Sequence, residues 1–172
     1  MAAGGDQQQR EVGRKSRPGA AIADARKPGN KHRSVVLRFL LDTNIVSEAR
    51  RRTQNPGFAL WWTNVASGRL YLSALTIGEI ERGIEKLRSR GDQKRVAGLT
   101  DWVTGLVRQF ADRILAIDVE VAAEWGQQRT GRKTPSIDGL IAATARVHDL
   151  TLVTRNVADM AGTGARMHNP FT

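Results

Sequence analysis

The chain contains no cysteine and only three histidines among its 172 residues. Without cysteine there is no disulfide, no thiolate zinc site and no cysteine nucleophile, and such a composition suits a reducing compartment. The histidines, His32, His148 and His168, are too few and too scattered for a histidine-rich metal site or a Ser/His/Asp triad. A catalytic site in this chain must therefore be built from other side chains.

Long apolar runs are also missing. The longest are far shorter than the roughly 20 residues that a membrane-spanning helix needs. The first residues lack the apolar stretch of a secretory signal peptide. We therefore expect a cytoplasmic protein with no membrane partner.

Positive charge is present in excess, since 27 Lys and Arg against 17 Asp and Glu give a formal net charge of +10. Such a chain favours polyanions over neutral metabolites, so nucleic acid is the first partner to consider. Residues 1–34 hold eight basic and three acidic residues and almost no large apolar side chain. We expect them to form a disordered basic extension, which either strengthens RNA binding or is simply solvated.

From residue 35 the sequence alternates between strand and helix patterns. Compact apolar runs predict strands at 35–41, 70–73, 114–118, 151–154 and, briefly, 165–169. Helical patterns lie between them, at 43–48, 56–62, 74–89, 92–110, 119–128 and 136–147. This alternation predicts one α/β domain over residues 35–172, a three-layer α/β/α sandwich around a mainly parallel sheet.

Four acidic residues lie where predicted strands end or the following helices begin. Asp42 directly follows the first strand, and Glu79 lies in the first two turns of the helix after LYLS. Asp138 lies in the first turn of the helix that Pro135 and Ser136 open, and Asp159 lies in the RNVAD loop after TLVT. Because the functional crevice of a parallel sheet lies at the carboxyl ends of its strands, we expect these four carboxylates to converge.

Each acid also has a simpler structural explanation. Asp42 could be only a helix N-cap, Asp138 a first-turn residue favoured by the helix dipole, and Asp159 a turn residue. Glu79 could be a solvated helix residue paired with Arg82. These explanations are independent of one another, whereas one shared site accounts for all four positions, so we favour the shared site.

A group of carboxylates suits phosphodiester hydrolysis. Mg²⁺ held by one or two carboxylates neutralises the phosphate, activates water and stabilises the leaving oxygen. Crowded carboxylates repel one another, which raises some of their pKa values and lowers stability until a cation binds. The composition of the predicted site therefore favours a metal-dependent nuclease.

Four segments carry a resemblance to a known family: FLLDTNIVSEARR, LYLSALTIGEIERGIEKL, SIDGLIAATARVHDLTLVTRNVADM and GTGARMHNPF. In their order and spacing the chain resembles a PIN domain from about Val36 to its C-terminus. In detail it is similar to the VapC-type toxins of bacterial toxin–antitoxin pairs, especially the FitB-like branch. The resemblance implies an endoribonuclease that cleaves structured RNA such as tRNA or rRNA, inhibits growth, forms a homodimer and is neutralised by a cognate antitoxin.

Residue by residue, the resemblance also implies roles within the site. Asp42 and Asp138 would bind Mg²⁺ directly, with Mn²⁺ as a substitute, and Glu79 and Asp159 would complete the acidic pocket. The chain departs from the family pattern at Gly139, where alanine is usual. Glycine can lower the stability of a helix by up to about 1 kcal/mol relative to alanine.

Two polar residues near the last acid, Thr154 and Asn156, match positions that support the pocket by hydrogen bonds in the family. Ordinary hydrogen bonding within the loop is the alternative explanation for both. Their proposed role therefore depends on where the acids lie.

Two further groups suggest binding surfaces. Trp61 and Trp62 are adjacent on a helix and cannot both point directly into one core, so one of them could line a groove for an antitoxin helix. Packing of both partly inside is the alternative. Arg50, Arg51 and Arg52 follow the first short helix, where they could bind RNA phosphates or form a solvated basic turn.

Two other functions stay open. A non-catalytic nucleic-acid-binding module would keep the fold and the basic surface, but the complete set of acids argues against it. A phosphomonoesterase could use Asp42 as its nucleophile. The second aspartate expected two residues later is absent, because Asn44 stands there.

Overall fold

The computed structural model of the chain describes Met1, residues 36–128 and residues 136–171. Apart from Met1, the basic extension predicted over residues 1–34 lies outside the described residues and stays a prediction. Within the described part of the chain, no helix is long and apolar enough to cross a membrane.

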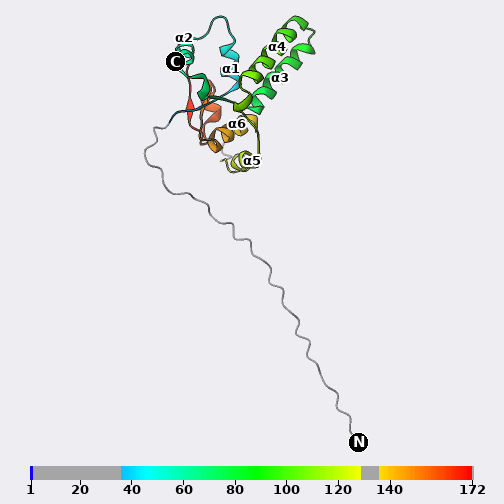
Figure 1. Ribbon diagram of the computed structural model, residues 1–172, viewed down its shortest axis with the longest axis vertical. Helices are drawn as coiled ribbons and strands as arrows, with labels where there is room; N and C mark the ends of the chain where they lie inside the picture. The colour runs from blue at the N-terminus through cyan, green and yellow to red at the C-terminus, as the bar shows by residue number, and fades with distance from the viewer. Residues whose placement is uncertain (2–35, 129–135, 172) are drawn as a thin grey trace. The chain divides into compact units, whose positions relative to one another are not determined.

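One sheet of five strands, all parallel, organises the described residues (Figure 1). The strands are β1 (Phe39–Leu41), β2 (Leu70–Ser73), β3 (Ile114–Leu115), β4 (Thr151–Val153) and β5 (Met167–His168), in the order β3-β2-β1-β4-β5. Chain order therefore reverses beside the central strand β1, which pairs with β2 on one side and β4 on the other. In parallel sheets, such a reversal is the place where a crevice forms at the carboxyl ends of the strands.

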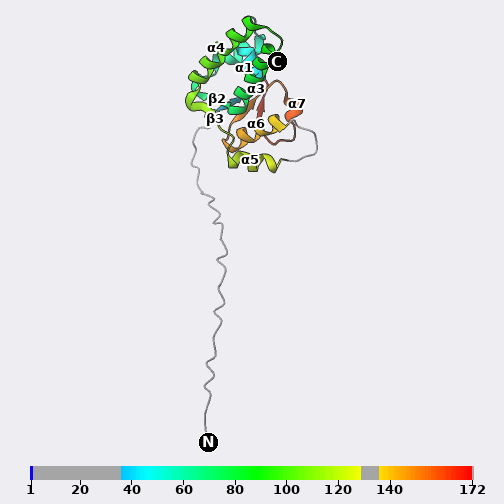
Figure 2. The same ribbon diagram turned by 90° about the vertical axis from the view of Figure 1, so that its right-hand side faces the viewer.

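Helices cover both faces of this sheet, with α1 and α4 on one side and α5 and α6 on the other (Figure 2). They are α1 (Thr43–Ala49), α2 (Pro56–Asn64), α3 (Ala74–Arg88), α4 (Gln93–Gln109), α5 (Val119–Gly126), α6 (Ser136–Val147) and α7 (Val157–Met160). Two short 3₁₀ turns, η1 (Ser67–Arg69) and η2 (Ala111–Arg113), precede β2 and β3. This arrangement confirms the predicted three-layer α/β fold, and its sheet is entirely rather than mainly parallel.

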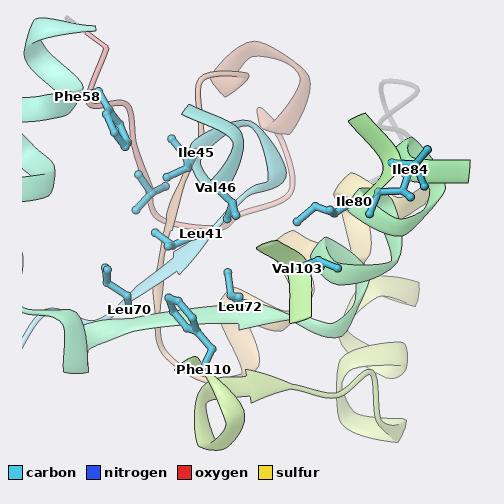
Figure 3. Packing of buried hydrophobic residues seen from close by; sticks show 12 residues of the cluster. Leu41, Ile45, Val46, Phe58, Leu70, Leu72, Ile80, Ile84, Val103 and Phe110 are labelled. Atoms are coloured by element: carbon cyan, nitrogen blue, oxygen red, sulfur yellow. The ribbon is translucent and has the colours of Figure 1, made fainter. Parts of the chain in front are cut away.

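Two apolar clusters hold the layers together. On one face, one cluster contains Leu41 of β1, Phe58 of α2, and Ile80 and Ile84 of α3 (Figure 3). On the other face, a second cluster includes Leu40, Ile141, Leu152 and Met160. Because adjacent residues of β1 enter different clusters, the central strand is buried on both faces, as its continuous apolar sequence predicts.

Some boundaries differ from the sequence prediction by more than two residues. The first strand begins at Phe39 and not at residue 35, because β2 and β4 provide paired residues only from that point. The third ends at Leu115, because its neighbour β2 ends at Ser73. Asp118, predicted to lie in that strand, is instead the N-cap of α5 and accepts a hydrogen bond from Val121 N at 2.9 Å. The RNVAD segment is also not a plain loop, since it contains the short helix α7.

The start of α2 anchors an aromatic group to the core. Pro56 occupies the first turn, and the Asn55 side chain accepts a hydrogen bond from Phe58 N at 3.1 Å. The Phe58 ring is fully buried and stacks on Trp62 at 5.5 Å and on Phe171 at 5.6 Å between ring centroids. Phe58 therefore links α2 to the C-terminal segment.

We expect Phe58→Ala to lower the free energy of unfolding by about 3–5 kcal/mol, because it leaves a cavity among three aromatic rings. Urea denaturation followed by circular dichroism measures the change. Leu60→Ala in the same helix is the matched control, since Leu60 is 68% exposed, and should change stability by less than about 0.5 kcal/mol. Equal losses in the two variants would contradict this packing.

Candidate active site

Asp42 lies at the carboxyl end of the central strand β1 and is only 6% exposed. It is the N-cap of α1, where its Oδ1 accepts a hydrogen bond from Thr43 N at 2.7 Å. Its Oδ2 accepts two further hydrogen bonds, from Asn44 Nδ2 at 2.5 Å and from Thr154 Oγ1 at 2.7 Å. The N-cap explanation is therefore correct, and it accounts for only one of the two carboxylate oxygens.

Opposing effects act on the ionisation of Asp42. Burial raises the pKa of Asp42 above its ordinary value, while the hydrogen bonds from Thr154, Thr43 and Asn44 act in the other direction. Thr154 directly follows β4, the strand beside β1. The site thus begins at the two strands between which the chain order reverses.

Glu79 reaches the same place from α3. Its Oε2 accepts a hydrogen bond from Thr43 Oγ1 at 2.5 Å, so one residue of α1 contacts both Asp42 and Glu79. None of the ion pairs among the described residues joins Glu79 to Arg82, the partner that the simpler explanation requires. Glu79 is therefore turned toward the acidic group.

Asp138 lies in the first turn of α6 and is half-buried. Burial raises the pKa of Asp138 to about 6, with further contributions from the negative charges of Asp42, Glu79 and Asp159. The charges of the three other predicted acids thus act on Asp138. The four acids come from the N-cap of α1 and from α3, α6 and α7.

The last acid, Asp159, lies on the exposed side of the group in α7. Its Oδ2 accepts a hydrogen bond from Asn156 Nδ2 at 2.6 Å, and Asn156 N donates to Thr154 Oγ1 at 2.9 Å. Thr154 and Asn156 thus form a chain of hydrogen bonds between Asp159 and Asp42.

The donor set fits a small, hard cation. No three acidic or histidine side chains of the described residues lie close enough to enclose an ion by themselves. Mg²⁺ does not need such a cage, because it keeps several waters and is commonly held by one or two carboxylates. Three other carboxylates repel the negative charge of Asp138. A bound divalent cation would reduce this repulsion.

Sequence reasoning missed two residues of the site, Thr43 and Asn44. Asn44 donates to Asp42 and Thr154 and also accepts a hydrogen bond from Arg155 N at 3.1 Å. A signal was present, because two hydrogen-bonding side chains directly follow an aspartate at a strand end. We assigned a role to the aspartate alone.

Gly139 has a packing role that the sequence did not reveal. A Cβ atom there would lie 2.9 Å from Trp125 Nε1 and 3.1 Å from Gln128 Oε1. Gln128 Nε2 donates to the Gly139 carbonyl at 2.8 Å. Glycine thus allows α5 and the residues after it to approach the start of α6, next to Asp138.

The predicted arginine group is divided. The Arg50 guanidinium lies over the Trp102 ring, 5.4 Å from its centroid. Arg51 pairs with the buried Glu48 at 3.0 Å, and Arg52 is exposed. Arg50 and Arg51 are thus held by local contacts, and the contact of the three arginines with RNA stays a prediction.

The tryptophan pair packs partly inside, as the simpler explanation states. Trp61 lies 5.5 Å from both Phe39 and His168 between ring centroids. Trp62 stacks on Phe58 and also lines a cavity of about 170 Å³ with Trp102. The described structure therefore gives Trp62 a place in a groove as well as in the core.

Comparison with known proteins agrees with this geometry. The PIN domain family model matches residues 39–158. Toxin FitB of Neisseria gonorrhoeae is 34% identical over 138 residues, which cover 77% of this chain and 98% of that protein. The tRNA(fMet)-specific endonuclease VapC of Shigella flexneri is 29% identical over 136 residues, which cover 75% and 94%.

The crystal structure of FitAcB from Neisseria gonorrhoeae is similar in three dimensions, with a TM-score of 0.70 and 33% identity over 77% of this chain and 98% of that one. The family model extends from β1 to the start of α7 and includes Asp42, Glu79 and Asp138, while Asp159 lies one residue beyond its end. The chain therefore belongs to the PIN domain family and, within it, to the VapC-type toxin ribonucleases.

Proposed function

We propose that this ribonuclease is a Mg²⁺-dependent endoribonuclease that serves as the toxin of a toxin–antitoxin pair in the cytoplasm. The observation that carries the proposal is the set of hydrogen bonds at the carboxyl edge of the sheet that connects the buried Asp42 to Glu79 through Thr43 and to Asp159 through Thr154 and Asn156. The charges of these three acids also act on Asp138. Such a site has little use in a protein that only binds RNA, because it repels phosphate unless a cation is present.

Asp42 and Asp138 would hold the ion, with Mn²⁺ as a substitute. When bound, the ion would neutralise charge on the scissile phosphate and lower the pKa of water. Glu79 and Asp159 would orient the attacking water by hydrogen bonds. Thr43 holds Glu79, and Asn156 holds Asp159, so both carboxylates are oriented before RNA binds.

The substrate we propose is structured RNA, with tRNA as the first candidate and rRNA as the second. The Shigella flexneri relative is a tRNA(fMet)-specific endonuclease by name, which supports testing tRNA first. Sequence-specific RNA recognition mostly uses unpaired loops, so a tRNA loop is the expected cleavage region.

A cognate antitoxin is the proposed protein partner, and we expect the toxin itself to form a homodimer. Two neighbouring cavities, of about 170 and 310 Å³, share Arg50 and Trp102 in their walls. The first is lined by Trp62, and the second reaches Thr43 and Glu79 of the site. An amphipathic antitoxin helix could occupy this groove and cover the acids at one end.

We predict that Asp42→Asn and Asp138→Asn each reduce RNA cleavage by more than about 100-fold, because loss of a carboxylate that binds the metal costs more than loss of a supporting residue. Cleavage of total tRNA by purified protein in Mg²⁺, with mapping of the new ends, measures this. Both variants should keep the wild-type circular dichroism spectrum.

Asp112→Asn is the matched control, since Asp112 is 85% exposed and contacts Arg113 away from the four acids. It should cleave like the wild type. Undiminished cleavage by either site variant would refute the assigned roles. RNA binding without any cleavage by the wild type would favour the non-catalytic alternative.

Stability should also depend on the metal. A ligand that binds only the folded state raises the free energy of unfolding by about 2.7 kcal/mol when its free concentration is 100 times its Kd. The melting temperature should therefore be higher in saturating Mg²⁺ or Mn²⁺ than in EDTA. In EDTA at neutral pH, Asp138→Asn should melt above the wild type, because it removes one of four repelling charges. Identical wild-type melting curves with metal and with EDTA would contradict the proposal.

The pH dependence in EDTA follows from the same residue. The pKa of Asp138 is about 6 in the folded protein and 3.8 as an ordinary value. Between these values the folded state binds more protons than the unfolded state, so this group makes stability fall as pH rises from about 4 to 6. In Asp138→Asn, stability should decrease less between about pH 4 and pH 6 than in the wild type. Melting curves across this pH range measure the difference.

A further inference from the structure

Arg155 is bound into the acidic site through its backbone. It follows Thr154, whose hydroxyl donates to Asp42 at 2.7 Å. Arg155 N donates to Asn44 Oδ1 at 3.1 Å, and the amide nitrogen of the same Asn44 side chain donates to Asp42. The position of Arg155 is therefore fixed relative to the carboxylate at the centre of the site.

The Arg155 side chain rests on an aromatic support. Its guanidinium carbon lies 4.3 Å from the centroid of the Phe171 ring. Phe171 in turn stacks on Phe58, which is fully buried. A guanidinium stacked on a ring by its face keeps the N–H donors at its edge available, and its preorganisation lowers the entropy lost when it binds a ligand.

The positive charge of Arg155 is not used in an ion pair within the described part of the chain. Some of the other described arginines are paired with acids, as Arg51 is with Glu48, Arg146 with Glu124 and Arg166 with Asp149. Arg155 is exposed, and its contacts are the Phe171 ring and the backbone bond to Asn44. Its donors therefore remain free to bind an anion.

A group of four carboxylates repels the phosphates of RNA, so a cation beside it has a clear use. Among the arginines predicted from sequence to contact RNA, Arg50 stacks on Trp102 and Arg51 is paired. Arg155 is stacked on a ring as Arg50 is, but its backbone N donates to Asn44 and it directly follows Thr154, so its backbone is attached to the site. Arginine binds phosphate through two parallel N–H donors, which fixes both position and orientation.

We propose that Arg155 is an RNA-binding residue that holds a phosphate of the substrate next to the acidic site. The inference rests on the proposed function, because it assigns a contact to the RNA that this function requires. Asn44 fixes the backbone of Arg155 and Phe171 supports its side chain, so the phosphate is held at a set position relative to Asp42.

The test measures binding of tRNA to the full-length protein in EDTA over a series of NaCl concentrations. Each phosphate contact contributes roughly 0.7–0.9 to the slope of log affinity against log salt. Arg155→Gln should reduce the slope by about that amount and weaken binding about tenfold. Arg155→Lys keeps the charge without the paired donors, so it should restore the slope and only part of the affinity.

Arg95→Gln is the matched control, because Arg95 is 73% exposed and paired with Asp92 at the start of α4. It should change neither slope nor affinity. Phe171→Leu keeps the charge and an apolar side chain but removes the ring, so it should weaken binding with the slope unchanged.

Cleavage in Mg²⁺ separates this inference from the proposed function. If the wild type cleaves tRNA and Arg155→Gln matches it in KM and in salt slope, the Arg155 contact is refuted while the ribonuclease proposal stands. If Arg155→Gln raises KM with little change in kcat and lowers the slope, the contact is supported. A wild type that binds tRNA without cleaving it refutes the proposed function, and the salt slope of Arg155→Gln in EDTA then decides the Arg155 contact by itself.

Discussion

Burial of the Asp42 carboxylate is the constraint on which the rest of the site depends. A carboxylate removed from water is stable only if hydrogen-bond donors replace the lost hydration. Three donors from α1 and the end of β4 do this for Asp42. Their positions follow from the sheet, because β1 and β4 are neighbours only when the chain order reverses between them. The fold therefore supplies the donors that make the buried charge tolerable.

The other carboxylates are arranged around this one by short polar links. Thr43 connects Asp42 to Glu79, and Asn156 with Thr154 connects it to Asp159. Asp138 is brought from the opposite face of the sheet by α6, whose start packs closely on α5 because residue 139 has no side chain. The result concentrates negative charge at one edge of an otherwise basic protein, which lowers stability in the metal-free state and favours binding of a cation.

Much of the fold could be predicted from the sequence because its signals are local. Apolar runs such as FLL and LYLS mark strands, and Asn55 with Pro56 marks a helix start. The end of the third strand could not be predicted, because Leu115 ends that strand where the neighbouring strand stops pairing. The four acids could be selected because each follows a strand or begins a helix. Two contacts join residues that are distant in sequence: Arg155 lies over the Phe171 ring, and Trp125 lies where a side chain at residue 139 would be. No local sequence pattern indicates such contacts.

We propose that Asp42 and Asp138 share one metal ion at the carboxyl edge of the sheet. Crystals of the full-length protein grown with Mn²⁺, measured at a wavelength where manganese scatters anomalously, test this directly. We expect an anomalous peak within about 2.5 Å of a carboxylate oxygen of each residue, since direct metal–oxygen bonds are of that length or shorter. A peak elsewhere, or a fully occupied ion that touches neither carboxylate, would contradict it.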